Sequence, residues 1–374
     1  MKLSCLQENL NKGLNTVGRA VATRSTLPIT QNVLIQCDES RIKLTATNLE
    51  LAISTWIGAK IDQEGSVTVP ARLLSEFVGS LEKSQVDISS SGAGHTLDIQ
   101  SERFQARING TDASEFPPIP SVEGGLVVEV DPKALKAATH QVTLAAATED
   151  SRPVLTGVRL ELEDDEFILA AADGFRLAVH KGKMLTSVAA PVQVIVPAKT
   201  LIEVNRILAD QEEPVEIRLI PDGAQILFKL KDVEIISQLV QGTFPNYAQL
   251  IPQNSTTRAN VRVSDFLRAT RATSIFARDG SSIVRLHVQP GNPGTLRVLA
   301  RAEEVGENTG ELDAQVEGDE AKIAFNFKYL LDLLNVIDSE EIVLELNSPS
   351  SPGVLRPLSS VDYVHVIMPM FVQW

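Results

Sequence analysis

The sequence predicts an α+β protein built from three domains of like topology. Three observations lead to this expectation. An amphipathic helical stripe recurs three times, a pair of strand-like segments recurs three times, and one pattern of Gly and Pro residues recurs at the end of successive units. With 374 residues, of which 43% are apolar, the chain has enough material for two or three domains with cores of their own.

The helical stripes are the clearest repeat. Apolar residues stand at i, i+3, i+4 and i+7 in VPARLLSEFVGSL (69–81), VPAKTLIEVNRIL (196–208) and FNFKYLLDLLNVI (325–337). The starts of these segments are about 127 and about 129 residues apart, close to one domain length. A second series of stripes follows the natural N-cap residues Ser4, Asp131 and Ser264. We therefore expect six helices, over residues 7–24, 70–81, 132–147, 197–208, 264–278 and 326–338.

Paired strand-like segments recur between these helices. Two extended stretches flank a polar turn in RIKLTATNLELAISTWI (41–57), EFILAAADGFRLAVHKG (166–182) and TLRVLARAEEVGENTGEL (295–312). Short turns join antiparallel strands, and strands outnumber helices in every unit. Both features favour α+β over α/β.

A recurring Gly and Pro pattern closes each of the first two units. NGTDASEFPPIP (109–120) and QGTFPNYAQLIP (241–252) both place Gly-Thr before a Phe-Pro step and finish on Ile-Pro. An X-Pro step keeps the preceding residue extended and prevents a helix from continuing, so each segment marks the exit from a folded unit. We expect domains at 1–122, 123–253 and 254–374, with linkers at 124–125 and 253–260.

Composition excludes several classes of protein. No run of about 18 apolar residues exists, so no membrane span is expected. The first residues, MKLSCLQENLNK, become polar too early for a signal peptide. Two cysteines, Cys5 and Cys37, cannot form a disulfide framework, and we expect both to be buried free thiols. These features predict a cytoplasmic protein.

The charge is unevenly distributed along the chain. The net charge is −14, which on its own disfavours a phosphate-bearing partner. The six expected helices nevertheless hold roughly 12 Lys and Arg against roughly 6 Asp and Glu. A helical face could therefore attract a polyanion locally, although basic residues are also common on solvated helices. The basic residues of this face are Lys12, Arg19, Arg24, Arg72, Lys133, Lys136, Lys199, Arg206, Arg268 and Arg271.

Six ordered motifs together resemble the bacterial DNA sliding clamp, the beta subunit of DNA polymerase III. The resemblance covers the whole chain, and its most specific pieces are TRSTLPI (23–29), AADGFRLAV (171–179), VIVPAKTL (194–201), FPNYAQLIP (244–252), FNFKYLLDLLN (325–335) and VIMPM (366–370). It implies the DNA clamp fold, in which helices line a ring and antiparallel sheets form the outside. It also implies a homodimer that encircles duplex DNA without regard to sequence and gives a polymerase processivity.

The resemblance further implies where the chain contacts DNA and its second copy. Arg24 and Arg72 correspond to family positions near DNA, and the helical pattern adds Lys136 and Lys199. Phe104 corresponds to a subunit-interface position on an edge strand of the first domain, and Ile275 and Phe276 correspond to its apolar partners on the third. Two aromatic residues at a subunit seam would bury enough area to help hold a dimer.

The family also has a groove that binds short peptides containing Gln and Leu or Phe. Its ligands are replicative DNA polymerases, the clamp loader and repair proteins. Carried over position by position, one wall of the groove comprises Leu155, Ala172, Gly174, Phe175, Arg176 and Leu177. The other wall comprises Pro245, Gln249, Leu250, Asn326, Tyr329, Ile367, Met368, Pro369 and Met370. Aliphatic and Met side chains adapt to several ligands, while Arg176 and the backbone near Gly174 would fix polar ends.

Two other kinds of function compete with a DNA clamp. Against an enzyme, the histidines lack metal-ligand spacing, GAGHTL (92–97) lacks a dinucleotide fingerprint, and EDDE (163–166) reads as a solvated turn. We expect no catalysis, no cofactor and no metal. The histidines are His95, His140, His180, His287 and His365. The other alternative is a homomeric scaffold that gathers partners through the groove without holding DNA.

Overall fold

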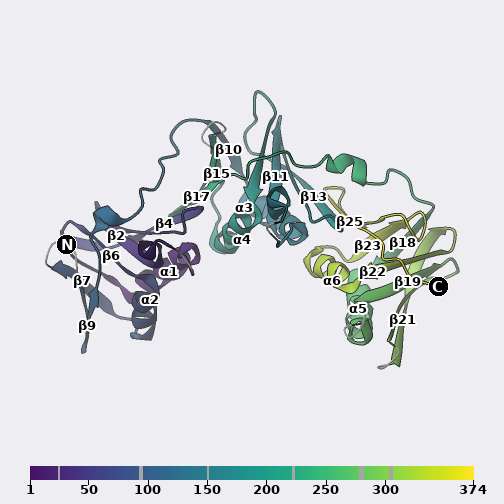
Figure 1. The fold of residues 1–374 in the computed structure, drawn as a ribbon, viewed down its shortest axis with the longest axis horizontal. Coiled ribbons are helices and arrows are strands. Elements are labelled where there is room, and N and C mark those ends of the chain that lie inside the picture. Colours follow the sequence, from purple (N-terminus) through teal and green to yellow (C-terminus); the bar gives the residue numbers. More distant parts are fainter. Residues whose placement is uncertain (24–25, 92–95, 150, 221–223, 278–281, 303–305) are drawn as a thin grey trace. The chain divides into compact units, whose positions relative to one another are not determined.

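A computed structural model gives the fold of the chain and describes residues 1–23, 26–91, 96–149, 151–220, 224–277, 282–302 and 306–374. The chain divides into two compact units. Unit 1 contains Met1–Pro132 and Glu203–Leu239, and unit 2 contains Lys133–Ile202 and Val240–Trp374. Figure 1 follows the course of the chain from its N-terminus to its C-terminus.

Unit 1 contains two antiparallel sheets. The smaller runs in the order β5 (Lys60–Gln63), β1 (Lys2–Leu6), β7 (Gln85–Ser91), β8 (Thr96–Ser101), β9 (Phe104–Asn109). The larger runs in the order β10 (Leu126–Val130), β15 (Val215–Ile220), β16 (Gln225–Lys229), β17 (Val233–Gln238), β4 (Leu51–Gly58), β3 (Arg41–Thr47), β2 (Asn32–Asp38), β6 (Ser66–Pro70).

Unit 2 contains one long antiparallel sheet. Its first half runs β14 (Val192–Pro197), β11 (Gly157–Glu163), β12 (Glu166–Ala172), β13 (Arg176–Lys183), β25 (Tyr363–Ile367), β24 (Gly353–Pro357). Its second half continues β23 (Glu341–Leu346), β18 (Thr257–Arg262), β21 (Gly306–Gly318), β20 (Gly294–Ala302), β19 (Ile283–Gln289), β22 (Ala321–Asn326). All three predicted strand pairs are confirmed, as β3–β4, β12–β13 and β20–β21.

The described residues form six α-helices, in the six places that the sequence predicts. They are α1 (Gln7–Val17), α2 (Ala71–Ser80), α3 (Pro132–Val142), α4 (Ala198–Ile207), α5 (Val263–Ala277) and α6 (Phe327–Val336). The first and third end earlier than expected, because a 3₁₀ turn follows each one, at Gly18–Ala20 and Thr143–Ala145. Such tightened turns are common at helix ends, and buried Ala20 and Ala145 prolong the apolar pattern there.

The predicted N-caps of two helices are wrong. Ser4 lies inside β1, and Ser264 lies inside α5. Instead, a backbone carbonyl of a neighbouring segment accepts the first N–H of the helix. Gln7 N donates to Ser84 O over 2.9 Å, and Val263 N donates to Glu340 O over 2.9 Å. A donor bonded in this way needs no side-chain cap.

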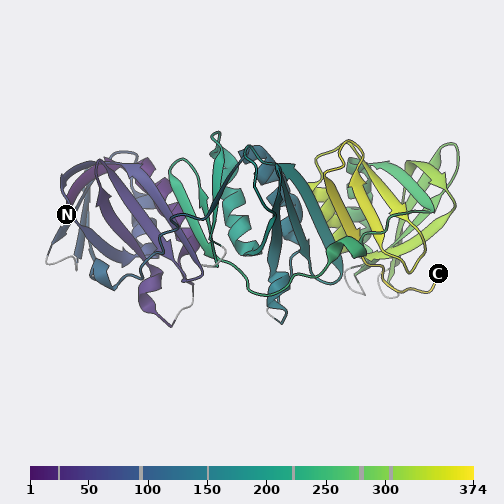
Figure 2. The ribbon, with the colours of Figure 1, turned by 90° about the horizontal axis from the view of Figure 1, so that it is seen from above.

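The helices cover the sheets through small and aliphatic side chains. Helices α1 and α2 lie side by side in unit 1, and α5 and α6 lie side by side in unit 2 (Figures 1 and 2). Gly13 lets α1 approach β3 closely, since a Cβ there would stand 2.8 Å from Leu44 Cδ1. Cys5 is a buried free thiol, and burial raises its pKa to about 12. Cys37 is only partly buried, which corrects the expectation that both thiols are buried.

Two strand pairings recur at equivalent places in the repeat, and we call them seams. In each, the second strand of a predicted hairpin pairs with the strand that ends the following repeat. The first seam is β4–β17, in which Leu51 faces Ser237 and Ala52 faces Ile236. The second is β13–β25, in which Arg176 faces Ile367 and Leu177 faces Val366.

A buried histidine stands at the second seam. His365 is fully buried, and its Nδ1 lies 3.0 Å from the Tyr363 hydroxyl, which donates to Gln141 O over 3.1 Å. Its Nε2 has no hydrogen-bond partner among the described residues. Protonation would therefore place an unsatisfied N–H in the core. The pKa of His365 is lowered to about 3, first by burial and then by the positive charge of Arg176, and burial also lowers the pKa of His180.

We expect the stability of unit 2 to fall in mild acid because of His365. The unfolded chain protonates His365 near pH 6.5, so stability is complete above that pH and is lost as the pH falls toward about 3. The loss from this residue approaches about 1.4 kcal/mol per pH unit. Chemical unfolding between pH 7 and pH 5 should show a shallower pH dependence in His365→Phe. The exposed His140→Phe is the matched control, and an unchanged slope in His365→Phe would contradict the assignment.

Candidate functional site

An Asx turn between β12 and β13 organises the residues expected to bind peptides. The Asp173 carboxylate accepts hydrogen bonds from Phe175 N over 2.8 Å and from Arg176 N over 3.0 Å. Gly174 takes φ +95°, a conformation that a residue with a Cβ adopts only under strain. The turn leaves the Phe175 side chain exposed at the edge of the second seam.

Arg176 is held by three partners. Its Nε donates to Asp173 Oδ2 over 3.0 Å, and its Nη1 donates to Asp332 Oδ2 over 2.7 Å. Its guanidinium carbon lies 4.5 Å from the centre of the Tyr329 ring. These contacts bury most of the side chain. Arg176 therefore joins the β12–β13 turn to α6. The sequence predicts that Arg176 binds a polar end of a ligand, but the carboxylates of Asp173 and Asp332 already pair with its guanidinium group.

Apolar side chains form the floor beside this turn. Three of the predicted residues, Leu155, Ala172 and Leu177, belong to one buried cluster with Phe244 and Val366. Val154, Tyr247 and Ile251 pack against the same cluster from partly exposed positions. The Tyr247 hydroxyl donates to Glu161 Oε1 over 2.7 Å, which fixes the linker that follows β17.

The end of β25 and the residues that follow it lie opposite the β12–β13 turn and complete the surface. Ile367 is buried and faces Arg176, and Met368 N donates to Phe175 O over 2.8 Å. Met370 N donates to Ala324 O over 2.8 Å, so the chain after Met368 runs beside β22. Phe175, Leu250 and Met368 are large apolar side chains left exposed. We call this surface the β13–β25 site; it comprises the β12–β13 turn, its apolar floor, the linker residues 245–251 and residues 367–370.

The remaining predicted residues lie at the margins of this site. Pro245 and Gln249 are exposed on the linker, and Pro369 is half-buried. Asn326 caps α6, since its side chain accepts a hydrogen bond from Lys328 N over 3.0 Å. Sequence reasoning missed Arg152, whose Nη2 donates to Asp173 O over 3.3 Å beside Gly174. The only local signal for Arg152 is its place before Pro153, which indicates a turn and not a contact.

The expected interface residues lie at exposed positions in the two units. Phe104 begins β9, an edge strand of the smaller sheet of unit 1, and is 57% exposed. In unit 2, Ile275 on α5 is 56% exposed and Phe276 is half-buried. Phe104 and Ile275 are therefore accessible to a partner surface.

The expected DNA-contacting residues lie on helices. Arg72 on α2, Lys136 on α3 and Lys199 on α4 are all exposed. Arg72 Nε donates to Glu76 Oε1 over 2.8 Å, one helical turn away. Arg24 lies outside the described residues.

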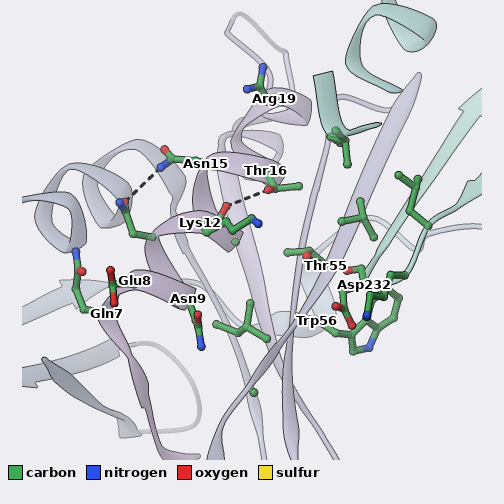
Figure 3. Close-up of a pocket in the computed structure, with 18 of the residues that line it drawn as sticks. Gln7, Glu8, Asn9, Lys12, Asn15, Thr16, Arg19, Thr55, Trp56 and Asp232 are labelled. Carbon is green, nitrogen blue, oxygen red and sulfur yellow. Dashed lines mark hydrogen bonds between the residues drawn. The ribbon is translucent and has the colours of Figure 1, made fainter. Parts of the chain in front are cut away.

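A hollow of about 980 Å³ in unit 1 collects further basic side chains (Figure 3). It lies between α1, the end of β4, the end of α4 and the β16–β17 turn, and Asn9, Asn11 and Asn15 add amide groups to it. Five basic side chains line it, against the acidic Glu8 and Asp232; they are Lys12, Arg19, Lys83, Arg206 and Lys231. The hollow is thus locally cationic in a chain of net charge −14.

Some of these cations are already paired. Glu203 contacts both Arg19, at 3.3 Å, and Arg206, at 2.5 Å. Lys83 Nζ lies 2.6 Å from Glu8 Oε1, which raises the pKa of Lys83. Lys12, Arg19 and Arg206 belong to the basic helical face that the sequence predicts. Lys83 follows α2 and Lys231 follows β16, so the search for basic residues within helices did not include them.

The described part of the chain contains no helix long and apolar enough to cross a membrane. It also contains no cluster of three or more His, Cys, Asp or Glu side chains arranged to hold a metal ion.

Comparison with known families gives three consecutive matches. Residues 1–120 match the N-terminal domain of the DNA polymerase III beta subunit, residues 129–246 its central domain, and residues 248–371 its C-terminal domain. The boundaries after residues 122 and 253 remain our prediction.

Curated relatives and solved structures agree with these matches. The beta sliding clamp of Synechocystis sp. is 31% identical over 389 residues, and that of Bacillus subtilis is 31% identical over 380; each comparison covers 99% of both chains. The crystal structure of the Bacillus subtilis sliding clamp has a TM-score of 0.93 at 30% identity, and that of the Thermotoga maritima beta subunit has 0.91 at 27%. Both cover 100% of each chain.

The repeated fold and the successive matches define a DNA clamp of three similar domains, which is not an enzyme. The chain belongs to the DNA polymerase III beta subunit family, the beta sliding clamps, and acts as a processivity factor in DNA replication.

Proposed function

We propose that two copies of this chain close head-to-tail into a ring around duplex DNA. The observation that carries the proposal is a missing third seam. Among the described strands, only β8 pairs with β9, and only β20 pairs with residues 306–314 of β21. In both seams, the second strand of a hairpin pairs with the last strand of a repeat. The second strand of the third hairpin is β21, and the last strand of the first repeat is β9, so we infer that β21 pairs with β9 of a second copy. An unpaired strand edge is a ready template for another chain.

Apolar side chains supplement this backbone pairing. Phe104 lies on the edge strand β9, while Ile275 and Phe276 lie on α5, which packs against β20 and β21. Their burial in a dimer would add the hydrophobic contribution that backbone hydrogen bonds alone lack.

The basic helices and the basic hollow would face the DNA backbone. Arg24, Arg72, Lys136 and Lys199 are the proposed contacts, together with Lys12, Arg19 and Arg206 in the hollow. Phosphate contacts carry no sequence information, so a ring can bind any duplex. Several of these cations already have carboxylate partners, which weakens their hold on phosphate and favours sliding.

The β13–β25 site would bind short peptides of the replicative polymerase, the clamp loader and repair proteins. It combines the exposed apolar side chains Phe175, Leu250 and Met368 with a packed apolar cluster, which suits Leu and Phe side chains. Since Arg176 is bound to Asp173 and Asp332, we assign it the role of holding the site in shape. We place the protein in the cytoplasm with the DNA that it serves.

Retention on circular DNA tests this function. We expect the protein, loaded onto nicked circular plasmid by a bacterial clamp loader with ATP, to co-elute with DNA at about 0.5 M salt. Salt at this concentration screens contacts between basic side chains and phosphates, but it does not release DNA that a closed ring encloses. A single restriction cut should release it. Retention after linearisation would indicate simple adhesion, and no retention on either form would favour a scaffold that does not hold DNA.

A further inference from the structure

A second cavity stands beside the first seam, β4–β17, in unit 1. It measures about 130 Å³ and is lined mainly by apolar side chains, among them Leu49, Leu51, Ile236, Pro117 and Ile119. An apolar cavity of about 150 Å³ can hold a benzene ring. The size therefore suits one Leu or Phe side chain.

The cavity occupies the place in the first seam that the β13–β25 site occupies in the second. Asn48 Oδ1 accepts hydrogen bonds from Glu50 N over 3.1 Å and from Leu51 N over 2.8 Å. Asp173 makes the same two bonds, two and three residues ahead, at the start of β13. Residues 117–120, from the first Phe-Pro segment, line the cavity, just as the second Phe-Pro segment lies beside the β13–β25 site.

The repeat alone does not explain the backbone conformation at Leu49, beside this cavity. It takes φ +78° at the position where the second seam has Gly174 at φ +95°. The Thr47 hydroxyl accepts a hydrogen bond from Leu49 N over 3.0 Å, and Gln238 Nε2 donates to Leu49 O over 3.3 Å. The Leu49 side chain is 49% exposed. A strained backbone that presents an apolar side chain to solvent indicates a use for that side chain.

The charge around the two seams differs, because Asp173 and Asp332 offset the arginines of the second seam, whereas no basic residue offsets Glu50 among the described residues that line the cavity. Arg152 and Arg176 lie at the turn of the second seam. At the first seam, Leu51 replaces Arg176, and Glu50 is the only charged residue among the described ones that line the cavity. Glu50 is exposed on the rim, so it can meet a cation without a large desolvation cost.

We propose that this cavity is a docking site for a peptide segment with a Leu or Phe side chain flanked by Lys or Arg. The apolar side chain enters between Leu49, Ile236 and Ile119, and a flanking cation pairs with Glu50. A single buried side chain gives weak binding, with a Kd on the order of 0.1–1 mM. The proposal goes beyond the peptide function of the β13–β25 site and predicts a different class of ligand.

Peptide titration of the full chain tests the proposal. The probes are fluorescein-labelled Lys-Leu-Phe-Lys-amide and its matched acidic form, Glu-Leu-Phe-Glu-amide, followed by fluorescence anisotropy at low salt. We expect the basic peptide to bind about tenfold more tightly than the acidic one. Glu50→Lys and Leu49→Gly should each weaken it about tenfold. Leu49→Gly should also raise the melting temperature, because it relieves the strain.

Glu64→Lys is the matched control, since it makes the same change of net charge at another exposed position of unit 1. It should leave the affinity for the basic peptide within about twofold. The proposal would be overturned by equal binding of the two peptides, by no saturable binding at millimolar concentration, or by affinities unmoved by Glu50→Lys and Leu49→Gly. None of these results bears on retention of the protein on circular DNA, so a negative peptide titration would overturn the proposed docking site without contradicting the proposed ring.

Discussion

We expect the double variant Phe104→Asp, Ile275→Asp to elute as a monomer in size-exclusion chromatography, and the unchanged protein to elute as a dimer. Both side chains are more than half exposed in the single chain, so aspartate is tolerated at either position before assembly. In the proposed dimer both would be buried, and each buried carboxylate costs at least about 2–3 kcal/mol. Together they weaken the dimer by more than about a thousandfold.

The control for this variant is Val361→Asp, which changes an 89% exposed side chain in the turn between β24 and β25. It should leave both the dimer and the melting temperature unchanged. A double variant that still elutes as a dimer would refute the assignment of these residues to the third seam. A monomeric variant should also fail to stay on nicked circular plasmid, because an open chain encloses nothing.

We expect the double variant Leu250→Asp, Met368→Asp to lose about a hundredfold in affinity for a peptide containing Gln, Leu and Phe. Both side chains are exposed at the β13–β25 site, and a bound Leu or Phe would bury them. Aspartate replaces apolar contact with a carboxylate that must lose its water. Isothermal titration with the synthetic peptide acetyl-Gln-Leu-Ala-Leu-Phe measures the change.

Leu358→Asp serves as the matched control, because Leu358 is an exposed leucine of unit 2 outside the site. It should bind the peptide as the unchanged protein does, and all variants should melt within a few degrees of one another. Unchanged affinity in the double variant would show that the peptide binds elsewhere.

The helices and hairpins were predictable because their signals are local. A stripe at i, i+3, i+4 and i+7 determines which face of α2, α4 or α6 is buried, whatever it packs against. The hairpins β3–β4 and β12–β13 need only a short polar turn between two extended runs. Repetition strengthened both predictions, since three independent segments gave the same pattern.

The contacts that define the sites were beyond local reasoning. Arg176 was expected to meet a ligand, but its partner Asp332 lies 156 residues further along the chain, and no spacing rule connects them. The N-caps failed for the same reason, because the carbonyls that replace Ser4 and Ser264 belong to other elements. Sequence-based reasoning also overlooked Leu49, since positive φ at a leucine runs against residue preference.

The way the helices begin has a consequence for folding. Gln7 and Val263 each donate the first backbone hydrogen bond of a helix to a carbonyl of another segment, so the start of α1 or α5 is not satisfied until that segment is in place. Short helices of this kind are marginal in isolation. Their formation is thus coupled to long-range collapse, which slows the search for the native topology but makes each unit order all at once. A chain emerging from the ribosome would complete the start of its first helix only after Ser84 had been synthesised.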